Sequence, residues 1–122
     1  MPLTHIHSLP AEVLCTTVIT LYEQMRGRVA RIHRARTSPA LIAACAQLQK
    51  NVHYFSLIPV LPFTTTAATY FEKFREQKIR IGTQDLRIAS IVLSVDGILV
   101  TSNRRDFQKI PNLLIEDWNP SL

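Results

Sequence analysis

The first half of the chain begins with an apolar run and continues with two segments of helical spacing. Residues 13–20 (VLCTTVIT) are apolar or β-branched throughout, which is typical of a buried parallel strand. Apolar side chains then recur at helical spacing from Leu21, which predicts a helix to about Arg36. Thr37-Ser38-Pro39 predicts the start of a second helix that runs to about Leu57. We expect six side chains of this second helix to face inward: Leu41, Ala44, Cys45, Leu48, Val52 and Phe55.

The second half alternates between short apolar runs and helical segments. Residues 58–63 (IPVLPF) contain two prolines, which restricts this run to an edge strand. Thr64 or Thr65 is expected to cap a helix that continues to about Gln77. The next helix, over residues 84–95, is apolar almost all round, so we expect it to be deeply packed.

Two further strands are predicted near the end of the chain, over residues 98–102 (ILVTS) and 113–118 (LLIEDW). Strands that alternate with helices predict an α/β fold with a mostly parallel sheet. The length of 122 residues is enough for one domain, which we place over residues 1–122.

Composition narrows the class of protein. Apolar residues make up 47% of the chain, so it can bury a core, yet the apolar runs fall far short of the roughly 20 residues of a membrane helix. No secretory signal is visible at the N-terminus, so we expect a soluble, cytoplasmic protein without membrane contact. Cys15 and Cys45 lie in apolar surroundings, which predicts reduced, packed thiols. The net charge of +5 favours a polyanionic partner, either nucleic acid or an acidic protein segment.

Polar side chains follow the predicted strands and begin the apolar helix. Glu23 follows the strand 13–20, Asp85 lies in the first turn of the apolar helix, and Asn103 and Asp106 follow the strand 98–102. Mostly parallel sheets bind ligands at the carboxyl ends of their strands, so these four side chains should meet at one edge. Carboxylate and amide oxygens suit Mg²⁺ or Mn²⁺, which can bridge a phosphate oxygen and activate a water for in-line attack.

Each of these residues also has a purely structural interpretation. Thr20-x-x-Glu23 matches a capping box, so Glu23 can serve as a cap. Asp85 can complement a helix dipole, and Asn103 and Asp106 are common loop residues. The pattern by itself leaves the structural and the chemical interpretation open.

Four segments resemble one known family. IGTQDLRIA, LVTSNRRDF and IPNLLIEDW closely resemble the C-terminal half of PIN domains, particularly the VapC-type toxins of bacterial toxin–antitoxin pairs, and TTVITLYEQMRGR resembles the segment that carries their second acid. The resemblance covers roughly residues 11–118 and implies a three-layer α/β/α fold and a metal-dependent endoribonuclease. It also implies a cognate antitoxin and a homodimer. Carried over by motif, Glu23 and Asp85 are metal ligands, and Asn103 or Asp106 completes the site.

One part of the family pattern is absent from this sequence. The family opens with a central strand that ends in an Asp-Thr-Asn or Asp-Thr-Asp motif, whereas MPLTHIHSLP, which stands before residues 13–20, looks like the helix and loop that normally follow. Three explanations stay open: the true start lies upstream, the chain is an inactive relative, or a second chain supplies the strand. The alternative function is therefore a catalytically silent module that binds an antitoxin or a full-length toxin. A ribonuclease requires that the missing first Asp be supplied.

Arginines near the predicted acids are candidates for contact with RNA phosphates. Arg80 and Arg87 flank Asp85 and can hold phosphate or pair with the acid. The helix after residues 13–20 carries a row of arginines that either grips phosphates or is a solvated face. The predicted RNA-binding set is Arg26, Arg28, Arg80, Arg87, Arg104 and Arg105.

Overall fold

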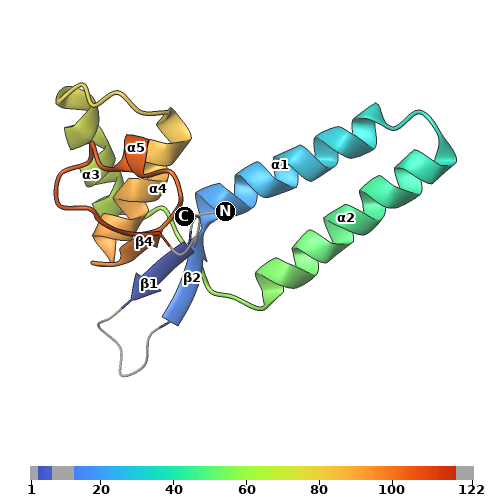
Figure 1. Ribbon diagram of the computed structural model, residues 1–122, viewed down its shortest axis with the longest axis horizontal. Helices are drawn as coiled ribbons and strands as arrows, with labels where there is room; N and C mark the ends of the chain where they lie inside the picture. The colour runs from blue at the N-terminus through green and yellow to red at the C-terminus, as the bar shows by residue number, and fades with distance from the viewer. Residues whose placement is uncertain (1–2, 7–12, 118–122) are drawn as a thin grey trace.

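A computed structural model describes residues 3–6 and 13–117 of the chain, and its strands form one sheet (Figure 1). The strands are β1 (Leu3–Ile6), β2 (Val13–Thr17), β3 (Val60–Leu61), β4 (Ile98–Val100) and β5 (Leu114–Glu116), in the spatial order β3-β2-β1-β4-β5. The β2–β3 and β4–β5 pairs are parallel, whereas β1 runs antiparallel to both of its neighbours. The predicted α/β fold with a mostly parallel sheet is therefore confirmed, and residues 58–63 contribute the edge strand β3.

The centre of the sheet is occupied by β1, and this corrects one prediction. Residues 3–6 form a strand, so the interpretation of the first ten residues as a helix and loop is wrong for this part. Thr4 is opposite Cys15 of β2 on one side and Leu99 of β4 on the other. The central position in the sheet, which lacked a strand in the resemblance to the family, is thus filled by β1, and β1 runs antiparallel to both neighbours.

Two hydroxyls are buried beside this central strand. The side chains of Thr4 and Thr16 are fully buried, and neither Oγ1 atom has a hydrogen-bond partner within the described ranges. A buried hydroxyl without a partner costs about 1–3 kcal/mol. These two unpaired hydroxyls therefore lower the stability of the centre of the sheet, where the strands are joined by backbone hydrogen bonds.

Strand β2 ends earlier than predicted. Helix α1 (Val18–Arg34) follows directly, and Thr17 is its N-cap, with an extended backbone (φ −112°). Thr17 Oγ1 accepts a hydrogen bond from Thr20 N at 3.1 Å, which satisfies a backbone donor that the first helical turn leaves unpaired. The predicted strand 13–20 therefore loses its last three residues to the helix.

Helices α1 and α2 (Ser38–Ser56) form a hairpin that projects away from the sheet (Figure 1). Thr37 caps α2, as its sequence predicts, and its Oγ1 accepts from Ala40 N at 3.2 Å. Asn51 of α2 joins the two helices, because it accepts from Arg28 Nε and donates to Gln24 Oε1.

The inward side of α2 is predicted only in part. Ala44 and Phe55 are buried and Leu48 is half-buried, but Leu41 is 43% exposed, Val52 is 56% exposed, and Cys45 is also exposed. The prediction is wrong for these last three because α1 covers only one side of α2 and the hairpin stands clear of the sheet. Of the two free cysteines, Cys15 is packed in β2, where burial raises the pKa of its thiol, and Cys45 is not packed.

The core lies between the sheet and helices α3 (Thr65–Glu76), α4 (Thr83–Ser94) and α5 (Arg104–Phe107). Thr64 is the N-cap of α3, which selects between the two predicted caps. Helix α4 is deeply packed, as expected from its apolar sequence. Its buried side chains meet aromatic residues of α3 and α5, one side chain of β4 and one of the loop after α5 in a single cluster: Phe71, Phe74, Leu86, Ile88, Ala89, Val92, Leu99, Phe107 and Ile110. This cluster holds the first turn of α4 and the end of β4 in fixed positions.

Candidate active site

Glu23 lies in the second turn of α1, just beyond the carboxyl end of β2. The sequence Thr20-x-x-Glu23 offered a capping box as one interpretation of this residue. The N-cap is Thr17 instead, and Thr20 uses its own hydroxyl to hydrogen-bond Thr17 Oγ1 at 3.1 Å. The capping-box interpretation is therefore wrong, and the Glu23 carboxylate needs another explanation.

Asp85 lies in the first turn of α4, as predicted. The N-cap of this helix is Gly82, which has no side chain to cap it, and Asp85 is half-buried next to it. Burial raises the pKa of Asp85, and the nearby negative charge of Asp106 raises it further. A favourable dipole position alone would lower the pKa of this carboxyl, so the dominant influences on Asp85 are burial and a second acid.

Glu23 is linked to Asp85 by its electrostatic environment. Burial raises the pKa of Glu23, the charge of Asp85 raises it further, and Arg26 lowers it. Glu23 therefore interacts with Asp85, and Asp85 interacts with Asp106. The fold therefore brings Glu23 within electrostatic range of Asp85, and Asp85 within range of Asp106, although the three acids are far apart in the sequence.

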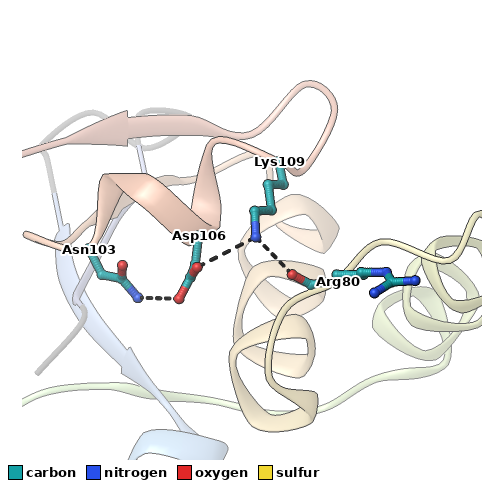
Figure 2. A network of polar contacts seen from close by, with 4 residues as sticks. All are labelled: Arg80, Asn103, Asp106 and Lys109. Atoms are coloured by element: carbon teal, nitrogen blue, oxygen red, sulfur yellow. Dashed lines mark hydrogen bonds and ion pairs between the residues drawn. The ribbon is translucent and has the colours of Figure 1, made fainter.

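Asp106 is held by a network of polar contacts around α5 (Figure 2). Asn103 Nδ2 donates to Asp106 Oδ2 at 3.2 Å, and Lys109 Nζ lies 3.7 Å from Asp106 Oδ1. Lys109 Nζ also donates to the carbonyl oxygen of Arg80 at 3.0 Å, in the segment that leads to α4. Both carboxylate oxygens of Asp106 are thus engaged, and one lysine ties α5 to the segment before Asp85.

Two residues of the site were not among the predicted ones. Lys109 was missed because its partners become neighbours only when residues 104–107 form the short helix α5, which we did not predict. The sequence did contain one signal for Lys109, because it follows Asp106 by three residues, a spacing at which side chains on a helix interact. Thr17 was missed because it stands in a β-branched run where three threonines can each cap a helix.

The donor set determines which ion the site can hold. Within residues 3–6 and 13–117, no three His, Cys, Asp or Glu side chains are close enough together to form a ready metal cage. The central strand β1 (LTHI) contributes no carboxylate. Mg²⁺ usually keeps several waters and takes only one or two carboxylates from a protein, so Glu23 and Asp85 fit a hydrated ion of this kind.

The predicted RNA-binding arginines fall into two groups. Arg87 and Arg28 are tied to the protein itself: Arg87 Nη1 donates to Gln84 Oε1 at 2.8 Å and its guanidinium lies 5.2 Å from the centre of the Phe71 ring. Arg28 Nε donates to Asn51 at 3.1 Å. The exposed group consists of Arg26, Arg80, Arg104 and Arg105.

Figure 2 shows that the side chain of Arg80 points away from Asp106. Arg26 is the arginine that lowers the pKa of Glu23, so it is electrostatically linked to the acids. Trp118, for which its apolar neighbours in the sequence predict a structural role, lies outside the described residues. Over the described ranges, no helix combines the length and apolar content that crossing a bilayer requires.

Comparison with known proteins places the chain among the VapC proteins. No family model matches the chain. It is 36% identical over 70 residues to Ribonuclease VapC2 of Rickettsia felis, a match that covers 54% of this chain and 52% of that relative. It is also 36% identical over 109 residues to the tRNA(fMet)-specific endonuclease VapC of Salmonella typhimurium, covering 86% of this chain and 75% of the relative. The chain thus spans about half the length of the first relative and three quarters of the second.

Solved structures agree with this placement. VapBC2 of Rickettsia felis, bound to a DNA fragment from its promoter, matches with a TM-score of 0.67 and 28% identity over 86% of this chain and 74% of that one. DNA-bound VapBC of Salmonella typhimurium matches with a TM-score of 0.67 and 30% identity over 85% of this chain and 74% of that one. These likenesses bear out the PIN-like α/β/α fold that the sequence resemblance implied. The chain therefore belongs to the VapC-type family of PIN-domain toxins.

Proposed function

We propose that this protein is a metal-dependent endoribonuclease that hydrolyses phosphodiester bonds of RNA. The observation that carries the proposal is the group of acids at one sheet edge, in which Asp85 raises the pKa of Glu23 and Asp106 raises the pKa of Asp85. A like charge close to a carboxylate disfavours its ionised form, and a bound cation would relieve this repulsion. The names of the two relatives, a ribonuclease and a tRNA-specific endonuclease, support the same reaction class.

Glu23 and Asp85 would hold a hydrated Mg²⁺ or Mn²⁺. When bound, such an ion supplies polarisation of the scissile phosphate and a water of lowered pKa for in-line attack. Asn103 and Lys109 hold the Asp106 carboxylate in one orientation, and the charge of Asp106 acts on Asp85. In this arrangement Asp106 influences the site by its charge next to Asp85. It would become a metal ligand only by giving up the hydrogen bond from Asn103.

The proposal includes a protein partner and a second copy of the chain. The VapBC structures support a cognate antitoxin as a partner, because they contain a VapB together with a VapC. The α1–α2 hairpin exposes apolar side chains such as Ile42 (70% exposed) and Leu57 (67% exposed), which provide surface for protein contact. Sedimentation of the protein alone and with its antitoxin tests both assignments.

The first experiment measures RNA cleavage with Mg²⁺ or Mn²⁺ for wild type, Glu23→Gln and Asp85→Asn. We expect each substitution to lower kcat/KM by more than the 10–100-fold that outer-shell partners of metals typically contribute. Glu72→Gln is the matched control, because Glu72 is an exposed acid on α3. Cleavage that persists in both site variants and in chelator would refute the proposal.

A second measurement does not depend on turnover. If Mn²⁺ binds the site of the folded protein and not the unfolded chain, it should raise the melting temperature of wild type and of Glu72→Gln. The same ion should have little effect on Asp85→Asn. A shift of equal size in Asp85→Asn would show that the ion binds elsewhere.

A catalytically silent binding module is the second candidate. It is favoured by β1, because the central strand brings no carboxylate to the site. This candidate predicts a protein that co-purifies with an antitoxin, shows no Mn²⁺-dependent shift in melting temperature, and cuts no RNA. Metal-dependent cleavage that Asp85→Asn abolishes would exclude it.

A further inference from the structure

The positive charge of the protein is concentrated in the α1–α2 hairpin. Over residues 18–57 the only acid is Glu23, against six basic side chains: Arg26, Arg28, Arg31, Arg34, Arg36 and Lys50. The excess of five equals the net charge of the whole chain, so the eight acids and eight basic residues outside this segment cancel. Solvated helix faces usually mix both signs, so this distribution indicates a surface for a polyanion.

A groove on α1 connects this charge with the candidate site. It has a volume of about 350 Å³, and its lining residues are Glu23, Gln24, Gly27, Arg28, Arg31 and Arg34. At Gly27 a methyl group would meet no atom within 4 Å, so the backbone there is open to an approaching ligand. From Glu23 to Arg34 the helix advances about 16 Å, since each residue adds about 1.5 Å. With one charge every 3.4 Å along a stacked strand, this length spans roughly four or five phosphates.

The arginines of the groove differ in their availability. Arg28 is already engaged with Asn51 and so stabilises the hairpin. Arg31 and Arg34 are exposed, and within the described part of the chain neither makes a hydrogen bond or an ion pair. Their charge is therefore available to a ligand, and Glu23 at the other end of the groove belongs to the group of acids.

We infer that the groove along α1 from Glu23 to Arg34 carries the RNA strand to the catalytic edge, with Arg31 and Arg34 binding backbone phosphates away from the scissile bond. The inference rests on the proposed ribonuclease function and adds the path of the substrate. It also selects Arg31 and Arg34 from the arginine row whose role the sequence left open, and it removes Arg87, whose guanidinium is occupied by Gln84 and Phe71.

The test compares Arg31→Gln/Arg34→Gln with Lys73→Gln/Lys78→Gln. Both double variants lose two exposed positive charges, but Lys73 and Lys78 belong to α3 and its C-terminal end, outside the groove. The probe is a labelled single-stranded RNA of about 16 nucleotides, the upper end of the site sizes of a single OB fold, so it extends beyond both ends of the groove. Fluorescence anisotropy measures its Kd in chelator, where no cleavage occurs, over a series of salt concentrations. Melting curves confirm that both variants are folded.

Each phosphate contact to a single strand contributes about −0.7 to the slope of log K against log salt. Arg31→Gln/Arg34→Gln should therefore flatten the slope by about 1.4 and weaken binding roughly tenfold or more at low salt. The α3 pair should alter both quantities much less. Equal effects of the two double variants would overturn the inference, because RNA would then respond only to net charge.

Cleavage separates this inference from the proposed function. If RNA follows the groove, Arg31→Gln/Arg34→Gln should lose more kcat/KM on the long RNA than on a tetranucleotide. Metal-dependent cleavage with equal losses on both substrates would refute the path and leave the ribonuclease intact. Groove-dependent RNA binding without any cleavage would refute the ribonuclease and support the path.

An acidic protein segment is the competing ligand for this groove. A labelled poly-glutamate peptide serves as its probe under the same conditions. Loss of peptide binding in Arg31→Gln/Arg34→Gln, with RNA binding unchanged, would overturn the assignment to RNA and identify a protein-docking surface.

Discussion

Thr17→Ala should destabilise the protein more than the loss of an ordinary helix cap. Thr17 Oγ1 accepts from Thr20 N at 3.1 Å and lies 3.1 Å from Thr20 Oγ1, and the two side chains are 1% and 3% exposed. Alanine at position 17 removes the cap and leaves the Thr20 hydroxyl buried without this partner. The same substitution weakens the connection between β2 and α1, which positions Glu23.

The expected magnitude has two parts. Loss of an N-cap hydroxyl costs about 1 kcal/mol, and a buried hydroxyl left without a partner costs about 1–3 kcal/mol. Thr17→Ala should therefore lower the free energy of unfolding by about 2–4 kcal/mol. At about 4 °C per kcal/mol for a chain of this size, the melting temperature should fall by roughly 8–16 °C.

Urea unfolding followed by circular dichroism measures this difference, with Thr64→Ala as the matched control. Thr64 caps α3 through the same contact, Oγ1 to Ala67 N at 3.1 Å, but its side chain is exposed. We expect about 1 kcal/mol for Thr64→Ala. A double-mutant cycle with Thr20→Val isolates the coupling, since the double variant has no orphaned hydroxyl and should cost less than the sum of the single changes. Equal losses in Thr17→Ala and Thr64→Ala, together with additive behaviour in the cycle, would refute the reasoning.

Three further predictions concern the acids, the lysine and the central strands. Burial and Asp106 raise the pKa of Asp85 above its ordinary value of 3.8, so the metal-free native state loses stability as the pH rises through the window above 3.8. Asp85→Asn should therefore melt higher than wild type in chelator near neutral pH, and the gap should close toward pH 3.8; a gap independent of pH would contradict this. Lys109→Met should cost only about 1 kcal/mol in urea unfolding, because the pair is 45% and 38% exposed, but should lower kcat/KM about 10–100-fold, whereas Lys109→Arg should retain most activity. Thr16→Val removes a fully buried, unpartnered hydroxyl and should raise the free energy of unfolding by about 1 kcal/mol, and destabilisation would show that this hydroxyl has a partner in solution.

Helix boundaries were predictable where a local contact sets them. Thr37 and Thr64 begin their helices with a side-chain hydrogen bond to a backbone N–H three residues on, a signal that needs no tertiary information. The boundary at Thr17 was missed because VLCTTVIT is β-branched on both sides of it. In that run the choice between strand and helix depends on where β1 and β3 stop pairing with β2.

Packing was less predictable than the elements themselves. The spacing of Leu41 and Val52 shows that α2 has an apolar side, but not that another element covers it, and both side chains are exposed. The strand β1 was missed because four residues are too few for a periodicity. Its place in the sheet depends on pairing with residues almost a hundred positions later.

In the candidate site, too, some features were predictable from the sequence and others depend on the folded structure. The rule that parallel strands end at one edge predicted that Glu23, Asp85 and Asp106 would lie near one another. In the structure Asp85 raises the pKa of Glu23, and Asp106 raises the pKa of Asp85. The bond between Asn103 and Asp106 and the role of Lys109 depend on the helical turn at residues 104–107. Sequence alone contains no strong signal for a helix of four residues.

The central position of β1 has a consequence for folding during synthesis. β1 can pair with β2 as soon as both leave the ribosome, but Leu3 must wait for Val100 on its other side. At a translation rate of about 5–20 residues per second, that wait lasts roughly 5–20 s. Throughout this interval the middle strand of the finished sheet is an open edge, and such an edge is a template for pairing with other chains. The nascent chain is therefore most vulnerable to misassembly at the strand that later becomes the best protected.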